Sequence, residues 1–232
     1  MIALMQPYFF PKLSYWQLIH SVDTFVIYDD VQYKKGGWIN RNKILVNNSI
    51  KTISIPLKHD NFKKMINERF LAENWNLEKK RLLVLIKDNY KKSINFEIIY
   101  PLIIKILNFN DMSLSKFITN SIIEITNYLE INTKIICSSS LNISNKFKKE
   151  SKIIEICKML NSIKYVNSIG GKEIYDQNDF QKDNIELHFL QPTNLLNHLN
   201  SSTFELSIID SLMNTKKQVL QKELDAFKLS LY

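Results

Sequence analysis

The sequence predicts an α/β protein with a Rossmann-like central sheet, mostly parallel or mixed, a β-hairpin, and a helical insertion in the middle. Short apolar runs alternate with helix-like periods near both ends of the chain, two β-type runs flank Asn47-Asn48, and long helical periods fill residues 62–131. A chain of 232 residues with 45% hydrophobic and 23% charged residues can bury a sizeable core. We therefore expect a single α/β domain over 1–232, with 62–131 as a helical insertion or subdomain.

The first elements follow the order strand, loop, helix, strand. An apolar run at Ile2–Met5 stops at Gln6-Pro7, a helical period covers Leu13–His20, and a second apolar run, Thr24–Tyr28, stops at Asp29-Asp30. This order is typical of a parallel sheet, whose ligands bind beyond the carboxyl ends of the strands. Gln6, Tyr8 and the two aspartates are expected at that edge.

The middle of the chain predicts a hairpin and then three helices. Lys43–Val46 and Ile50–Ile55 flank the turn at Asn47-Asn48, so the sheet is expected to be mixed. Apolar residues at helical spacing then predict helices over Arg81–Tyr90, Phe96–Phe109 and Leu114–Leu129. This part carries no ligand-like cluster and is interpreted as scaffold.

The last third returns to alternating strands and helices. We expect strands at Lys134–Cys137, Tyr165–Val166 and Ile185–Leu190, and helical segments at Glu150–Leu160, Glu173–Phe180 and Phe204–Leu229, the last with a break near Asn214.

Composition narrows the class of protein. Of the 31 basic residues only Arg41, Arg69 and Arg81 are arginine, and the lysines are scattered, so the net charge of +8 indicates a solvated, compositionally biased surface more than a nucleic-acid interface. An anionic small substrate remains compatible with this charge. No apolar run approaches the roughly 18 residues of a membrane span, and no basic segment precedes the first strand. We therefore expect no membrane insertion. Cys137 and Cys157 have no metal-ligand spacing, which favours a reduced, cytoplasmic protein.

Asp29 and Asp30 are candidates for catalysis because they end a predicted strand. Carboxylates at such an edge can bind Mg²⁺, receive a substrate amine or act as a general base. They can equally cap the next turn or pair with Lys34 and Arg41. Adjacent residues of an extended strand point to opposite faces, so at most one is expected to face the site.

A second candidate group surrounds Arg41. This arginine stands between Asn40 and Asn42 and shortly after Trp38, in a chain where lysine has nearly replaced arginine. A planar guanidinium between two amides indicates bidentate recognition of a carboxylate or phosphate. A salt bridge to Asp29 or Asp30 is the structural alternative.

A third candidate lies at Asn167–Lys172, where a predicted strand leads into Ser168, Gly170, Gly171 and Lys172. Paired glycines let backbone N–H groups face an anion, and Lys172 adds positive charge. The spacing is not that of a P-loop, and an ordinary turn would use the same glycines. If this turn follows a strand of the same sheet, Lys172, Arg41 and one aspartate should line one cleft.

The histidines form no recognisable nucleophile or zinc signature. They are His20, His59, His188 and His198. His20 is retained as a catalytic candidate because it lies on the helix after the aromatic loop. It could also be a structural residue. No residue spacing predicts a metal site.

Four blocks in order along the chain resemble the WbqC-like protein family. They are MQPYFFPKLSYWQLI, FVIYDDVQYKKGGWINRN, YVNSIGGKEIYD and LSIIDSLM. The family is associated with bacterial O-antigen and surface-polysaccharide (lipopolysaccharide) gene clusters, and the resemblance implies decoration of an amino sugar by N-acylation with an amino-acid-derived group. One departure is Lys12-Leu13-Ser14, where relatives tend to have an aromatic residue and then glycine.

The resemblance carries over a set of substrate-binding and catalytic positions in this sequence. These are Gln6, Tyr8, Asp29, Asp30, Gln32, Trp38, Asn40, Arg41, Asn42, Ser168, Gly170, Gly171 and Lys172. Asp29, Asp30 or His20 would remove the proton of an attacking amine. The remaining residues would bind a nucleotide-linked sugar and stabilise the developing oxyanion.

The leading hypothesis is therefore a transferase that moves an acyl or aminoacyl group to the amino group of a nucleotide-linked sugar, with an unknown donor. Alternatives are a non-catalytic sugar-nucleotide-binding subunit of polysaccharide assembly, and a transferase that uses an aminoacyl-tRNA. A further alternative is an ATP-dependent amide-forming ligase of nucleotidyltransferase-like fold. For the ligase, the phosphate-binding His-x-Gly-His element is replaced by Lys12-Leu13-Ser14-Tyr15.

Overall fold

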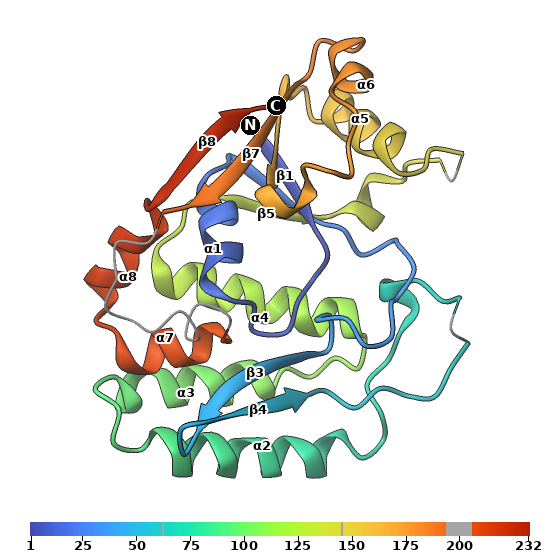
Figure 1. Cartoon of the computed structure of the whole chain (residues 1–232). Helices are drawn as coiled ribbons and strands as arrows, with labels where there is room; N and C mark the ends of the chain where they lie inside the picture. The colour runs from blue at the N-terminus through green and yellow to red at the C-terminus, as the bar shows by residue number, and fades with distance from the viewer. Residues whose placement is uncertain (62, 145, 194–205) are drawn as a thin grey trace.

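A computed structural model describes residues 1–61, 63–144, 146–193 and 206–232 of the chain. Its centre is a six-stranded sheet in the order β5-β2-β1-β6-β7-β8 (Figure 1). The strands are β1 (Ile2–Met5), β2 (Thr24–Ile27), β5 (Lys134–Cys137), β6 (Lys164–Ser168), β7 (Glu186–Pro192) and β8 (Phe227–Leu231). All neighbours pair in parallel except β8, which is antiparallel to β7. The predicted α/β class with a mixed, mostly parallel sheet is confirmed. The antiparallel strand is β8, however, and the hairpin predicted around Asn47-Asn48 forms a separate two-stranded sheet.

Helices cover both faces of this sheet (Figure 1). On one face Ala3, Phe25 and Ile27 pack into a core shared with α1 (Leu13–His20), α4 (Leu114–Leu129) and α8 (Lys217–Leu224). On the other face Leu4, Val26 and Tyr165 pack with α5 (Glu150–Met159) and α6 (Gln177–Gln181). Because adjacent strand residues point to opposite faces, apolar runs such as Ile2–Leu4 supply both cores.

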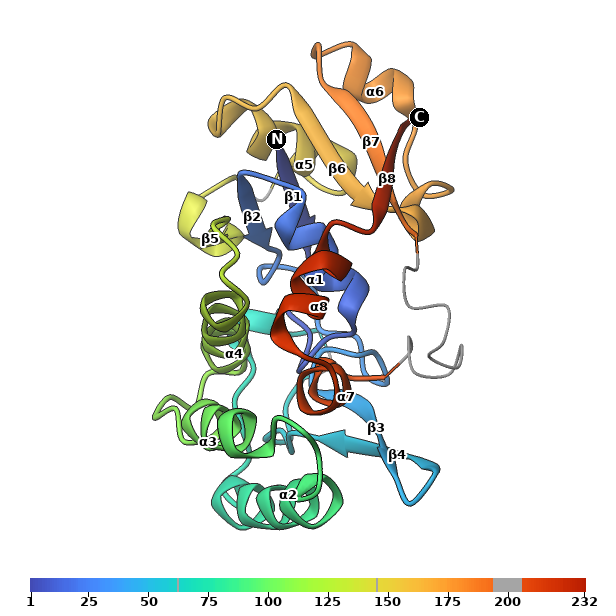
Figure 2. The same cartoon turned by 90° about the vertical axis from the view of Figure 1, so that its left-hand side faces the viewer.

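A second layer lies beyond the carboxyl ends of the parallel strands. It contains the hairpin β3 (Arg41–Val46) and β4 (Ser49–Ser54), with α2 (Trp75–Tyr90), α3 (Phe96–Leu107) and α7 (Ile208–Asn214). Figure 2 shows this layer below the sheet, with α4 between the two. Asn47 and Asn48 adopt φ values of 48° and 60°, as a tight two-residue hairpin turn requires.

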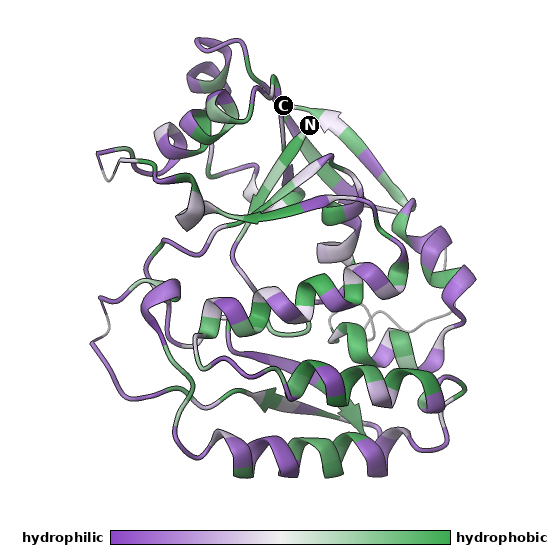
Figure 3. Cartoon of the chain, turned by 180° about the vertical axis from the view of Figure 1, so that it is seen from behind, coloured by the Kyte–Doolittle hydropathy of each residue, from purple (hydrophilic) through white to green (hydrophobic). Residues whose placement is uncertain are grey.

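Hydropathy agrees with this arrangement. Figure 3 shows the strands of the sheet mostly green and the helices striped green and purple, as expected for strands buried between amphipathic helices. Short 3₁₀ helices η1 (Ile66–Glu68), η2 (Ser138–Leu141) and η3 (Ile169–Gly171) complete the described elements. No helix among the described residues is long and apolar enough to span a membrane.

Three predicted elements differ from the structure. The helix expected over Phe204–Leu229 is two short helices, α7 and α8, followed by the edge strand β8; its expected start at Phe204 lies outside the described residues. The helical segment expected over Glu173–Phe180 begins only at Gln177, where the Asp176 carboxylate accepts a hydrogen bond from Asn178 N. Helix α2 begins at Trp75, earlier than the expected Arg81.

Candidate functional site

A cleft of about 1220 Å³ opens between the carboxyl ends of β1 and β2 and the second layer. Twelve residues line it: Gln6, Gln32, Tyr33, Lys34, Lys35, Asn40, Leu57, Lys58, His59, Asp60, Asn61 and Arg69. Four of these side chains are Lys or Arg and one is Asp, so the lining is strongly cationic. Such a lining favours an anionic ligand.

The fold builds this cleft from segments that follow strands. Gln6 comes directly after β1, and the segment after β2 contributes Gln32 to Lys35. The loop after β4 contributes Leu57 to Asn61, and Arg69 follows η1. A β-bridge between Gln32 and Met65 and a hydrogen bond from Tyr33 N to Lys64 O (3.0 Å) hold these segments together.

Three predicted substrate-binding residues line the cleft, namely Gln6, Gln32 and Asn40. The Asn40 amide is also part of the scaffold: its Oδ1 accepts from Tyr33 Oη at 2.8 Å and its Nδ2 donates to Ile55 O at 2.8 Å. The Gln6 carbonyl accepts from Tyr15 Oη at 2.9 Å, which fixes the backbone after β1.

Asp29 lies outside the cleft lining and is buried, with 2% of its surface exposed. Its Oδ1 accepts hydrogen bonds from Ser139 N (3.0 Å) and Ser138 Oγ (3.3 Å). Its Oδ2 accepts from Ser115 Oγ (2.7 Å) and Ser139 Oγ (2.9 Å). Both carboxylate oxygens are thus engaged by the protein, which supports a structural role for Asp29 and weakens its assignment as a general base.

Asp30 forms an ion pair that local sequence patterns did not indicate. Its Oδ2 lies 2.6 Å from Lys152 Nζ of α5, and Ser138 Oγ donates to its Oδ1. The Lys152 ammonium also lies 5.1 Å from the centre of the Tyr28 ring. Lys152 is only 7% exposed, so this pair is shielded from water, and Asp30 does not line the cleft. The alternative of a salt bridge from Asp30 to Lys34 or Arg41 is not found among the described residues, where Lys152 is its partner.

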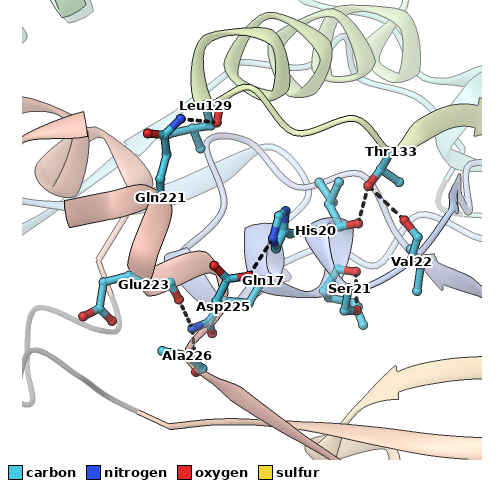
Figure 4. Close-up of polar contacts among 12 residues, drawn as sticks. Gln17, His20, Ser21, Val22, Leu129, Thr133, Gln221, Glu223, Asp225 and Ala226 are labelled. Carbon is cyan, nitrogen blue, oxygen red and sulfur yellow. Dashed lines mark hydrogen bonds and ion pairs between the residues drawn. The ribbon is translucent and has the colours of Figure 1, made fainter. Parts of the chain in front are cut away.

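His20 lies at the opposite edge of the sheet from the aspartates. Helix α1 runs back from the carboxyl end of β1 and ends at His20, just before β2 begins. Its Nε2 lies 2.9 Å from Asp225 Oδ1 in the segment after α8 (Figure 4). His20 therefore joins two elements far from the cleft and is left out of the catalytic site.

The group around Arg41 is also used within the fold. Arg41 Nε donates to Gly37 O at 3.0 Å, Nη2 donates to Gly36 O, and the guanidinium stacks 5.3 Å from the centre of the exposed Trp38 ring. The buried Asn42 amide donates to Phe9 O (3.0 Å) and Phe10 O (2.7 Å). Tyr8 is half-buried against Tyr15, and burial raises its pKa.

The Ser168–Lys172 turn does not meet the cleft either. A Cβ on Gly171 would lie 2.9 Å from Asn167 Nδ2, so this glycine packs closely against the Asn167 side chain within the turn. The Lys172 ammonium lies 5.6 Å from the centre of the Tyr232 ring. None of Asp29, Asp30, Arg41 and Lys172 belongs to the lining of this cleft, so the cleft does not bring these residues together.

Several cleft residues were missed at the level of sequence, among them Lys34, Lys35, Lys58, His59 and Arg69. The scarcity of arginine that drew attention to Arg41 applies equally to Arg69. The lysines carry no comparable signal in a lysine-rich chain. His198 lies outside the described residues. Within the described ranges, no group of three or more His, Cys, Asp or Glu residues could hold a metal ion.

Comparisons with known proteins place the chain in a family. The model of the WbqC-like protein family matches residues 6–222. An uncharacterized protein, Rv1507c, of Mycobacterium tuberculosis (strain ATCC 25618 / H37Rv) is 26% identical over 192 residues, which cover 80% of each chain. No solved structure matches the chain. Since the family model spans nearly all of the sequence, including every residue of the cleft lining, the chain belongs to the WbqC-like protein family.

Proposed function

We propose that this protein transfers an acyl or aminoacyl group to the amino group of a nucleotide-linked sugar during surface-polysaccharide (O-antigen) biosynthesis. The observation that supports this proposal best is the cationic cleft at the carboxyl ends of β1 and β2. Ligands of parallel α/β sheets bind at this edge. A nucleotide-linked sugar is anionic through its diphosphate, which suits a lining with four cationic side chains and one carboxylate.

The reaction needs a base for the attacking amine. In the step proposed, the sugar nitrogen attacks the acyl carbonyl carbon, a C–N bond forms, and the bond from that carbon to the donor's leaving group breaks. His59 lines the cleft, and its imidazole can accept the proton lost by nitrogen and return it to the leaving group. It replaces Asp29, Asp30 and His20 in this role.

Amide side chains supply the donors for the developing negative charge on the acyl oxygen. Gln6 lines the cleft directly after β1, and Gln32 lines it from the segment that follows β2. Their positions are fixed by the backbone contacts of Gln6 O with Tyr15 and of Gln32 with Met65. Donors held on a rigid sheet edge stabilise an oxyanion without reorganising during the reaction.

Mass spectrometry of nucleotide-linked amino sugars after incubation with the protein and a panel of acyl and aminoacyl donors tests the reaction. We expect a mass increase equal to the acyl group only when protein and donor are both present. His59→Ala should lower the rate by about 100-fold or more. His188→Ala is the matched control, because His188 contacts Glu186 at 2.9 Å and lies outside the cleft lining.

The outcomes distinguish the alternatives. Product formed only with an aminoacyl-tRNA donor would identify that donor class, and product formed only with ATP and a free acid would identify a ligase. Binding of the nucleotide-linked sugar without any product would contradict the transferase proposal and support a non-catalytic binding subunit.

A further inference from the structure

Arg69 is a buried cation that forms no ion pair with an acidic residue in the described part of the chain. The residue is 8% exposed, and its guanidinium lines the cleft. Its Nη1 donates to the carbonyl oxygen of Asn61 (3.2 Å) and its Nη2 to that of Lys58 (3.5 Å). Its Nε is buried and has no hydrogen-bond partner among the described residues. Placing a guanidinium charge out of water in this way is costly unless an anion balances it.

The carboxylate in the cleft lining, that of Asp60, balances this charge only weakly. The nearby Arg69 charge helps to lower the pKa of Asp60, but it does so less than Lys64, and the two side chains form no ion pair. Asp60 forms an ion pair with Lys64 at 2.6 Å, and that hydrogen bond is the main reason its pKa is lowered. No described carboxylate forms an ion pair with Arg69, whereas Arg81 pairs with Glu78 at 2.6 Å. The Arg69 charge is therefore available to a ligand in the cleft.

The surroundings hold Arg69 in a fixed position. Its guanidinium carbon lies 4.8 Å from the centre of the Tyr33 ring, a cation–π contact with a side chain that is itself bound to Asn40. The backbone N–H and C=O groups of Arg69 are both hydrogen-bonded: its N donates to Ile66 O (3.2 Å), and its O accepts from Leu114 N (2.9 Å). A rigid, planar donor is suited to a phosphate or carboxylate.

We propose that Arg69 is the principal binding residue of a phosphate site in this cleft, supported by Lys34, Lys35 and Lys58, and that its ligand is the diphosphate of a nucleotide. The assignment of a nucleotide rests on the proposed function. The anion site itself rests on the geometry of Arg69. This role falls to Arg69 in place of Arg41, whose donors are directed to the carbonyls of Gly36 and Gly37.

A chain with three arginines allows a direct test without altering Arg69. In protein labelled with ¹⁵N-arginine, three Nε–H signals are expected, and Arg41→Lys and Arg81→Lys assign Arg69 by elimination. Addition of pyrophosphate or uridine diphosphate should shift the Arg69 signal and leave that of Arg81 unchanged. An unmoved Arg69 signal at saturating concentrations of both would overturn the site. A shift with succinate but with neither phosphate compound would overturn the phosphate assignment.

Calorimetric titration with pyrophosphate measures the size of the effect. Arg69→Met should weaken binding by about tenfold or more, because charge-assisted hydrogen bonds are lost. Arg41→Met and Arg81→Met should bind as the unaltered protein does. Equal affinity of Arg69→Met and the unaltered protein would contradict the proposal. Circular dichroism melting of Arg69→Met confirms that the variant is folded, which we expect because it removes an uncompensated buried charge.

The two proposals can fail separately. A moving Arg69 signal with no acylated product under any donor would remove the transferase function and leave the phosphate site standing. Acylated product formed equally well by Arg69→Met would leave the transferase function standing and remove Arg69 from substrate binding.

Discussion

Asp29 connects three separate segments of the chain through one carboxylate. It lies two residues after the end of β2. Its carboxylate accepts hydrogen bonds from Ser115 at the start of α4 and from Ser138 and Ser139 after β5. The Ser115 hydroxyl is buried, so it cannot turn to water if the carboxylate is removed. The Ser138 hydroxyl also donates to Asp30, and the Ser139 hydroxyl is only partly buried. Asp29 is therefore expected to matter for stability more than for proton transfer.

Asp29→Ala should lower the free energy of unfolding by about 1–3 kcal/mol, because it leaves buried donors without acceptors. Urea denaturation followed by circular dichroism measures this change. Ser140→Ala is the control, since its exposed hydroxyl donates only to Cys137 O. A variant as stable as the unaltered protein would show that these hydrogen bonds contribute nothing.

Asp210 is a second buried carboxylate, but its environment differs. Burial raises its pKa from 3.8 to about 6, although Tyr90 Oη and Leu45 N donate to its Oδ1. Its Oδ2 is buried and has no hydrogen-bond partner among the described residues. Because the folded-state pKa exceeds the unfolded-state pKa, the protonated form favours folding, and this contribution is lost as pH rises between about 4 and 6.

Asp210→Asn should remove this pH dependence. The difference in unfolding free energy between variant and unaltered protein is expected to grow in favour of the variant by up to about 3 kcal/mol from pH 4 to pH 7. Urea denaturation at a series of pH values measures it. Parallel stability curves for the two proteins would mean that Asp210 does not titrate in this range.

At the level of elements, the side chain of Asn42 joins the β3–β4 hairpin to the aromatic loop after β1. The Asn42 amide of β3 donates to both Phe9 O and Phe10 O. Phe10 adopts a φ of 44°, an unfavourable value for a bulky residue, and the two carbonyl contacts help to hold this conformation. Asn42 was predicted to bind substrate, but its amide is used to position the loop.

Asn42→Ala should therefore destabilise the protein by about 1–3 kcal/mol and leave the pyrophosphate affinity of the folded protein unchanged. Thermal melting and calorimetric titration of the same sample separate the two effects. Loss of affinity without loss of stability would return Asn42 to the binding site.

Sequence periods predict the helices and strands well where an element has one buried face. Helices and strands with a buried face, such as α1 and β1, lie where their periods predict. At the C-terminal end the apolar residues of β8 alternate with Lys228 and Ser230, as in a strand. This run is short and closely follows the amphipathic α8, so its sequence also fits a continuation of the helical period.

Site residues were less predictable than elements for a physical reason. Sequence motifs placed Asp29 and Gln6 at the correct sheet edge, but the direction of each side chain depends on partners distant in the chain, such as Ser115 for Asp29. Lys152 and Arg69 differ from the other basic residues because folding buries them. Lys152 is buried in an ion pair with Asp30, whereas Arg69 is buried without an ion pair to a described carboxylate.

At the scale of the whole molecule, the two layers share one core. The cluster that contains Ala3 and Phe25 of the sheet also contains Ile86 of α2, Ile103 of α3 and Phe117 of α4. Helices with such contacts cannot keep their apolar faces buried if the sheet unfolds. Residues 62–131 are therefore expected to unfold together with the sheet.

Variants that retain only Trp16 or only Trp75, with the other tryptophans replaced by phenylalanine, test this expectation. Trp16 reports on α1 against the sheet and Trp75 on α2 in the second layer. Their fluorescence should change at the same urea concentration once each variant's own stability is taken into account. Two separated transitions in a variant that retains both would show that residues 62–131 form an independent unit.

Two consecutive residues in the first turn of α4 contact Arg69 of the cleft and the buried Asp29. Leu114 N donates to the carbonyl of Arg69, and Ser115 Oγ donates to Asp29. A displacement of this turn by a ligand on Arg69 would thus be transmitted to Asp29, and through Ser138 to the Asp30–Lys152 pair on the far face of the sheet. These contacts connect Arg69 in the cleft to α5, and we expect occupancy of the cleft to alter amide hydrogen exchange in that helix.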